Sequence, residues 1–220
     1  TFRGIAGMNL LKTDGYNRDH SLYVAGEGSY TKGYFDNPQD FSRWNGLIKY
    51  HGKISPNTTL TATATGFTSK WNASGQIPDR AIEQGIVGFF GAIDPNEGGE
   101  TSRYNANLEL LSYLSNGAAI RNQLFYSKYA FELYSNFTFY KEDPINGDQI
   151  RQKENRNIVG YNGSFLKEFN LGKFKTETKA GIQLRYDAVK NIELTRTMNR
   201  SINTDEIMLG DVNELNAAAY

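Results

Sequence analysis

The chain has 220 residues, with 24 basic and 24 acidic side chains and therefore a formal net charge of zero. Balanced charge gives no electrostatic reason to bind nucleic acid, so we expect no nucleic-acid partner. The chain contains no Cys, which excludes disulfide bonds and thiol chemistry within it. Its longest apolar run, near residues 86–93, is too short for a membrane helix, which needs about 20 apolar residues.

The first 70 residues alternate between apolar and polar side chains with a period of two, which is the pattern of β-strands. In one segment, for example, Trp44, Ile48 and Tyr50 alternate with polar residues. Asp14 and Gly15 form a turn dipeptide between the first two segments. The predicted strands are residues 2–12, 21–32, 42–53 and 58–70, with a loop at 33–40 and a tight turn at 55–57.

Beyond residue 70, long loops and short turns alternate between the predicted strands. Strands are expected at residues 102–113, 119–140, 157–169, 174–189 and 213–220. The connections between them are long loops at residues 71–100, 141–156 and 191–211, and short turns at 115–117 and 170–173. This sorting is typical of outer-membrane barrels, which have short turns at one rim and long loops at the other.

Residues 119–140 form the longest predicted strand and the most informative one. From Phe125 to Phe139 the odd positions are largely aromatic or apolar and the even positions are mixed. Upstream, Ile120 and Leu124 occupy even positions, so we expect a β-bulge near Leu124 that shifts the phase. Strands in soluble proteins usually have about five or six residues, so a strand of this length favours a wall between two different solvents.

We therefore expect an all-β protein, an antiparallel transmembrane β-barrel of which this chain supplies about nine strands. A barrel in lipid must close, because unpaired strand edges cannot be tolerated there. The strand pattern runs up to both ends of the chain, so we expect the chain to be an internal piece of a longer protein.

Several segments resemble the barrel region of TonB-dependent outer-membrane receptors. They span most of the chain in the order found in that family, and together they are more specific than any one alone. The segments are FDNPQDFSRWNGLIKY, WNASGQIPDRAIEQG, GAIDPNEGGETSRY, LYSNFTFYKEDPINGDQ, GIQLRYD and NELNAAAY.

The resemblance implies a 22-stranded barrel filled by an N-terminal plug and located in the bacterial outer membrane. Receptors of this family import scarce ligands such as ferric siderophores, haem, cobalamin, other metal chelates and some oligosaccharides. The implied partners are outer-membrane lipid, a small-molecule or metal-chelate ligand, and the TonB complex, which would act through a plug. This chain contains no segment that matches the plug or the TonB-contacting segment.

The predicted loop at residues 71–100, together with the start of the following strand, is the best candidate for contact with a ligand. Its side chains offer stacking, charge and hydrogen bonds at the mouth of a pocket. The candidates are Trp71, Arg80, Glu83, Gln84, Asp94 and Arg103. The competing interpretation is structural: residues 77–79 begin a short helical turn that ends at Gly85, and Trp71 belongs to an interfacial belt.

We expect no catalytic residues, no metal site and no cofactor. His20 and His51 are the only imidazoles, and neither belongs to a known catalytic or zinc-binding pattern. Glu142, Asp143 and Asp148 group oxygen ligands as Ca²⁺ would require, but their spacing fits a solvated turn better than a calcium loop. Charged residues on the polar strand faces are expected to point into the lumen and to bond to a plug.

Two other interpretations of the sequence are a passive porin-like channel and a soluble β-sandwich that acts as a binding module. A channel would need a barrel closed by its own strands and no plug. A sandwich would place side chains such as Tyr104, Phe131 and Ile182 in a shared dry interior.

Overall fold

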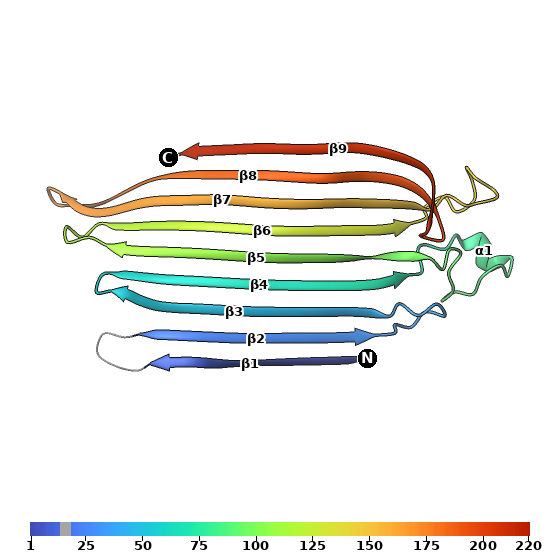
Figure 1. The fold of residues 1–220 in the computed structure, drawn as a ribbon, viewed down its shortest axis with the longest axis horizontal. Helices are drawn as coiled ribbons and strands as arrows, with labels where there is room; N and C mark the ends of the chain where they lie inside the picture. Colours follow the sequence, from blue (N-terminus) through green and yellow to red (C-terminus); the bar gives the residue numbers. More distant parts are fainter. Residues whose placement is uncertain (14–18) are drawn as a thin grey trace.

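The computed structural model describes residues 1–13 and 19–220, with the backbone alone at residues 202, 204 and 206–208. These residues form one antiparallel sheet of nine strands, in which each strand pairs only with its neighbours in the sequence (Figure 1). The predictions of an all-β chain and of about nine strands are confirmed. The strands are β1 (Phe2–Thr13), β2 (His20–Thr31), β3 (Phe41–Ser55), β4 (Thr58–Ala73), β5 (Glu97–Tyr113), β6 (Ala119–Ser135), β7 (Ile150–Leu171), β8 (Phe174–Met198) and β9 (Ile202–Ala219).

The sheet is open in the part of the chain that the structure describes. β1 pairs with β2 alone and β9 pairs with β8 alone, so each has one edge without a partner strand. The only helix among the described residues is α1 (Asp79–Glu83). No helix in these ranges has the length and apolarity that crossing a bilayer requires.

The connections are sorted by end, as predicted for most of them. Residues 56–57, 114–118 and 172–173 make short turns at one end of the sheet, and the loops 32–40, 74–96 and 136–149 lie at the other (Figure 1). We call the second end the loop end. Asp14 and Gly15, the predicted first turn, lie outside the described residues.

The third long loop predicted at residues 191–211 is wrong. β8 continues to Met198 and β9 begins at Ile202, so the connection is a tight turn at residues 199–201. Residues 71–73, 97–100 and 150–156 also belong to strands and not to loops, whereas β6 ends at Ser135 and residues 136–140 enter the following loop. The ends of β5 and β7 are rich in Gly and charged residues, which hides the alternation there.

The β-bulge predicted near Leu124 is also wrong. β6 pairs without a register shift along its whole length with both β5 and β7. Ile120, Leu124 and Tyr126 share one face throughout, and Phe125 and Phe131 lie on the opposite face. The aromatic residues at odd positions therefore extend across the polar face of the sheet.

One face of the sheet carries an apolar band to which every strand contributes. A single row of side chains in register crosses all nine strands and contains no charged residue. Its members are Met8, Val24, Ile48, Ala64, Ala106, Tyr126, Val159, Tyr186 and Leu215. We call this side the apolar face. Its large side chains are exposed: Ile48 is 54% exposed, Tyr104 is 52% and Ile182 is 48%.

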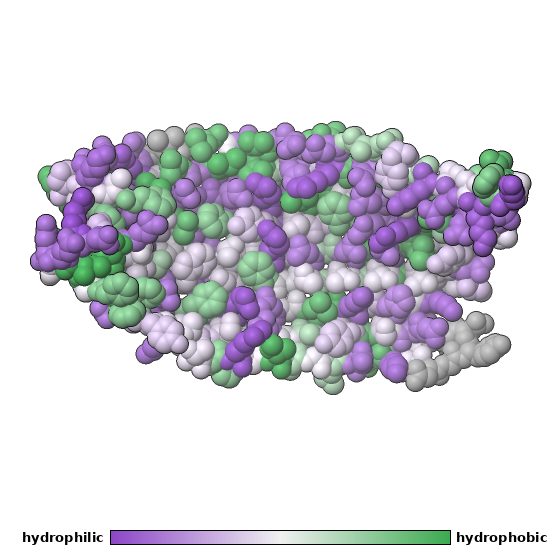
Figure 2. Space-filling model, turned by 180° about the vertical axis from the view of Figure 1, so that it is seen from behind, coloured by the Kyte–Doolittle hydropathy of each residue, from purple (hydrophilic) through white to green (hydrophobic). Residues whose placement is uncertain are grey.

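The opposite side, which we call the polar face, carries charged and amide side chains with aromatic residues among them. Figure 2 looks onto this face and shows hydrophilic residues spread over the sheet, with hydrophobic residues between them. Carboxylates on this face are partly covered by their partners; Glu27 has 17% of its side chain exposed and Asp187 is 6% exposed. Tyr104 and Ile182 do not share an interior with Phe131, which lies on this face.

Aromatic residues of the apolar face, beginning with Tyr30 near the loop end, lie along a line that slopes across the strands. Relative to the register row through Tyr30, Trp44 is displaced by two residues, Tyr104 by four, Tyr126 by six and Tyr186 by seven. Averaged from Tyr30 to Tyr104, Tyr126 and Tyr186, the displacement is about 1 to 1.5 residues per strand, whereas the single step to Trp44 is two residues. With about 3.3 Å per residue and about 4.8 Å between strands, the line makes an angle of roughly 35° to 45° with the register rows.

Candidate binding site at the loop end

The loops at the loop end contact one another through backbone and side-chain hydrogen bonds. The N–H of Asp36 donates to the carbonyl of Phe90 at 2.9 Å, and the side chain of Asn37 donates to the carbonyl of Pro95 at 2.9 Å. The rings of Phe35 and Phe90 meet edge to face with 6.3 Å between their centroids. Loops 32–40 and 74–96 therefore pack together as one surface.

The buried side-chain amide of Gln149 links loop 136–149 to loop 74–96 and to the turn between β8 and β9. Gln149 is 2% exposed, and its side-chain nitrogen donates to a carboxylate oxygen of Asp94 at 2.9 Å and to the carbonyl of Asn96 at 3.3 Å. Its side-chain oxygen accepts from the hydroxyl of Thr197 at 3.0 Å and from the N–H of Arg200 at 2.9 Å. All of the hydrogen-bonding groups of this side chain are used, as burial of an amide requires.

The tip of the β8–β9 hairpin completes this arrangement. The guanidinium of Arg200 donates to the carbonyl of Asn96 at 2.5 Å, to the carbonyl of Glu97, and to the side-chain oxygen of Asn72 at 3.2 Å. It also lies over the ring of Tyr134, 5.4 Å from the centroid. We call Asp94, Gln149 and Arg200 the loop clamp, because they join loop 74–96, loop 136–149 and the β8–β9 turn to the ends of the strands.

Loop 136–149 is organised by two carboxylates. Asp148 accepts the N–H groups of Lys141 at 3.0 Å, Glu142 at 3.0 Å and Asp143 at 2.7 Å. Burial alone would raise the pKa of Asp148, but these donors outweigh it and the pKa is lowered. Asp143 accepts the N–H groups of Asn146 at 2.9 Å and Ile145 at 3.0 Å, which lowers its pKa as well. These oxygens are occupied by backbone donors, which accounts for the clustering of carboxylates in the sequence.

A pocket of about 610 Å³ lies between loop 74–96 and loop 136–149. α1 forms part of its wall: the helix starts after Pro78 and is followed by Gly85, which has φ +71°, so the predicted short helical turn is confirmed. Arg80 and Gln84 line the pocket from this side, and residues 138–141 line it from the other. We call it the loop pocket.

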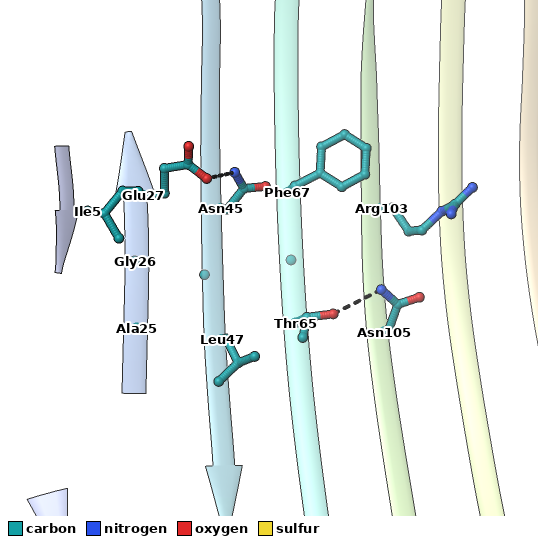
Figure 3. Close-up of a pocket in the computed structure, with 12 residues that line it drawn as sticks. Ile5, Ala25, Gly26, Glu27, Asn45, Leu47, Thr65, Phe67, Arg103 and Asn105 are labelled. Carbon is teal, nitrogen blue, oxygen red and sulfur yellow. Dashed lines mark hydrogen bonds between the residues drawn. The ribbon is translucent and has the colours of Figure 1, made fainter. Parts of the chain in front are cut away.

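A second pocket, of about 360 Å³, lies on the polar face over β1–β5 (Figure 3). Glu27 stands at its edge and is held by Arg3 at 2.7 Å, Arg43 at 3.0 Å and Asn45 at 2.8 Å. Arg103 lines the other side, with its guanidinium 4.9 Å from the centroid of the Tyr129 ring. No carboxylate among the described residues forms an ion pair with Arg103.

The structure does not bring the six predicted ligand-contacting residues together. Arg80 and Gln84 line the loop pocket, while Glu83 is exposed and lines neither pocket described above. Asp94 belongs to the loop clamp. Trp71 and Arg103 lie in β4 and β5 and not in a loop, in the register of the polar face.

Sequence reasoning missed the residues that organise this end of the molecule. Gln149 and Arg200 are about fifty residues apart in the sequence, and both lie in segments that were predicted to be loops. Phe139 and Lys141, which line the loop pocket, gave no signal either. The available signal was the pair of expected long loops at one end, which predicted that residues 71–100 and 141–156 would be neighbours.

The two imidazoles are engaged in cross-strand contacts. His20 shares a hydrogen bond of 2.7 Å with the hydroxyl of Tyr50, and His51 shares one of 2.9 Å with the hydroxyl of Thr61. Among residues 1–13 and 19–220, no three His, Cys, Asp or Glu side chains are grouped so that they could hold a metal ion.

Comparison with known proteins does not assign the chain to a family. No model of a known protein family matches the sequence, and no curated protein matches it significantly. The functional argument therefore depends on the geometry of the sheet and its loops and on the sequence segments described above.

Proposed function

We propose that this sheet is part of the barrel wall of a TonB-dependent receptor in the bacterial outer membrane. The receptor imports a scarce ligand such as a siderophore, haem or another metal chelate. The observation that carries the proposal is the uncharged row from Met8 to Leu215, to which each of the nine strands contributes one residue. A long exposed apolar face needs a hydrocarbon solvent, because water would make such a face an association surface.

The sloping line of aromatic residues supports the same proposal. In transmembrane barrels the strands tilt by roughly 35° to 45°, and aromatic residues mark the membrane boundary. If the strands tilt by that angle, the residue that lies at the membrane boundary shifts by about 1 to 1.5 positions from each strand to the next. The displacement from Tyr30 to Tyr186 has that slope.

The difference between the two ends of the sheet supports the proposal of a receptor. Two-residue turns at residues 56–57 and 172–173 leave little surface for recognition, whereas the loop end carries two long loops that are fixed by the loop clamp and enclose a pocket. Fixed loops limit the entropy lost when a ligand binds. In this proposal the loop end faces the outside of the cell, and further strands and a plug coupled to the TonB complex close the barrel and fill it.

Energy-dependent uptake by the full-length protein tests the proposal. A deletion strain grown on defined iron, cobalamin or glycan sources identifies the solute whose uptake is lost. Uptake of that solute by the complemented strain is then measured with and without a protonophore, and in a strain that lacks TonB. We expect uptake to stop in both cases, because transport depends on energy from the inner membrane.

Two outcomes would contradict the proposal. Uptake that continues without TonB, together with a steady conductance of the purified protein in planar bilayers, would indicate a passive channel. A full-length protein that stays soluble and monomeric without detergent would indicate a soluble binding module.

A further inference from the structure

The charged side chains that line the loop pocket are both cationic. Arg80 and Lys141 line the pocket from opposite loops, and no carboxylate lines it. Arg80 forms no ion pair with any carboxylate of the described residues. Lys141 lies 3.3 Å from Glu142, in a pair whose side chains are 74% and 53% exposed, so the pair contributes little and can be exchanged for a better partner.

The interior of the pocket is apolar and partly aromatic. Ile86, Ile93 and Phe139 contribute to its lining, and Gln84 and Tyr140 add polar groups. A volume of about 610 Å³ lies within the range of pockets that hold small organic ligands. A hydrated inorganic ion would leave these apolar walls without a partner.

Phe139 is held in a conformation that costs energy. It has φ +60°, in the left-handed region that a bulky residue rarely adopts. Its N–H bonds to the side chain of Asn136 at 2.8 Å, and its carbonyl accepts the N–H of Asp148 at 2.6 Å. Glycine would fit this backbone without strain, so a phenyl ring at this position indicates a use for the ring in the pocket.

We propose that the loop pocket binds an organic anion with an aromatic or aliphatic body. Arg80 and Lys141 hold the anionic group at the mouth, and Phe139 with the two isoleucines contacts the body. The inference deepens the proposed function by naming its ligand class, and it rests on that function only in placing the loop end outside the cell.

Binding of simple probes to the full-length protein in lipid nanodiscs tests the ligand class. The probe is 2-naphthalenesulfonate, titrated by saturation-transfer NMR against empty nanodiscs. The comparison compounds are 2-naphthylmethylammonium, which has the same ring and the opposite charge, and methanesulfonate, which is an anion without a ring. We expect binding of the naphthalenesulfonate alone. Equal binding of the ammonium compound, or no binding of the sulfonate, would overturn the proposal.

Substitutions of residues that line the loop pocket test whether the probe binds there. We expect Arg80→Gln and Lys141→Gln each to weaken binding by about tenfold, because each removes one charge-assisted contact. Lys32→Gln is the matched control, since Lys32 is an exposed cation in loop 32–40 that does not line the pocket. Glu142→Gln should strengthen binding by about twofold, because it frees Lys141. Unchanged binding in the Arg80→Gln and Lys141→Gln variants would overturn the proposal.

Phe139→Gly separates a ligand contact from a structural role. The substitution relieves the backbone strain and removes the ring, so we expect weaker binding with no loss of thermal stability. Undiminished binding of naphthalenesulfonate would contradict the proposal.

Failure of this inference and failure of the proposed function give different results. TonB-dependent uptake without naphthalenesulfonate binding would remove the ligand class and leave the receptor. Binding at Arg80 and Lys141 without energy-dependent uptake would remove the receptor and leave the pocket.

Discussion

The two faces of the sheet differ in what their side chains contact. On the polar face, hydrogen bonds run from strand to strand: Asn105 donates to Thr65 at 2.9 Å and accepts from Ser127 at 2.8 Å. On the apolar face, the row from Met8 to Leu215 is mostly aliphatic and exposed, and its hydrogen bonds are those of the Tyr126 and Tyr186 hydroxyls to Asn157 and Asn213. A soluble sheet with one solvated face has its polar side chains in water and its apolar ones covered. Here large apolar side chains such as Ile48, Leu108 and Ile182 stay about half exposed, with no second layer of the described residues over them.

Arginine substitutions at adjacent positions of β5 should give the largest difference between the faces. Leu108 is 50% exposed on the apolar face, and Asn107 is its neighbour on the polar face. We expect Leu108→Arg to lower the free energy of unfolding by about 2 to 4 kcal/mol, because a cation near the middle of the bilayer loses its hydration. Asn107→Arg should cost less than about 1 kcal/mol.

The measurement is urea unfolding of the full-length protein in lipid vesicles, followed by the shift of the folded band in gels. Similar losses in the two variants would mean that both faces meet the same solvent.

The loop clamp should be the next most sensitive feature, although its effect is local. Arg200→Ala leaves the carbonyls of Asn96 and Glu97 without their side-chain donor, which we expect to cost about 2 to 3 kcal/mol. Hydrogen exchange should become faster in residues 94–98 and stay unchanged in the middle of the strands. Arg196→Ala is the control, because Arg196 is an exposed residue of the same hairpin. Equal effects of the two variants would show that Arg200 does not fix the loops.

Acid should release loop 136–149 before it affects the sheet. A carboxyl whose pKa is lowered by folding contributes stability above its unfolded pKa of about 3.9, and this stability is lost as the pH falls through the lower folded value. A nitroxide attached at Ile145→Cys, which is 87% exposed in the native chain, should be ordered at neutral pH and become mobile only as the pH falls below the unfolded pKa and through the lower folded one.

The Asp148→Asn variant should be mobile at every pH, because an amide cannot accept all three N–H groups; the expected cost is about 1 to 2 kcal/mol. A label whose mobility follows pH identically with and without Asp148 would contradict this account of the loop.

The smallest effect concerns two glycines that face each other across β3 and β4. A Cβ at Gly66 would lie 2.9 Å from the ring of Tyr104, whereas nothing lies within 4 Å of a Cβ at Gly46. We therefore expect Gly66→Ala to cost about 1 kcal/mol and Gly46→Ala to be neutral or slightly stabilising, by vesicle unfolding as above. A reversed order would show that the Tyr104 ring does not rest on Gly66.

The central parts of most strands could be predicted from the sequence, because one face there is consistently apolar. Trp44, Ile48 and Tyr50 share a face in the structure as they do in the alternation. The signal is weaker where a strand continues beyond the apolar rows. In β8 the alternation in fact continues, since Ile192, Leu194 and Met198 share one face, but Asn191 and Arg196 interrupt it, and the sequence pattern predicted a loop there.

The features that the sequence pattern did not predict depend on the register of the strands and on contacts between residues far apart in the sequence. Phe125 and Phe131 lie on the polar face, and only the pairing of β6 with β5 and β7 reveals it. The loop clamp joins Asp94 to Arg200, and no local pattern connects residues so far apart in the sequence. Arg80 and Gln84 were predicted because they lie in a long loop, whereas their neighbour Glu83, chosen on the same grounds, lines neither of the two pockets.

Accessibility of nitroxide labels along β8 tests the central claim most directly. Single cysteines are placed at Ile182, Gln183, Leu184 and Arg185 in the full-length protein, in lipid vesicles, with any other cysteines replaced. The account predicts high collision rates with oxygen and low rates with a water-soluble nickel chelate at Ile182 and Leu184, and low collision rates with oxygen at Gln183 and Arg185. Labels at Ile182 and Leu184 that meet the nickel chelate, or that meet neither reagent, would contradict a lipid-facing wall.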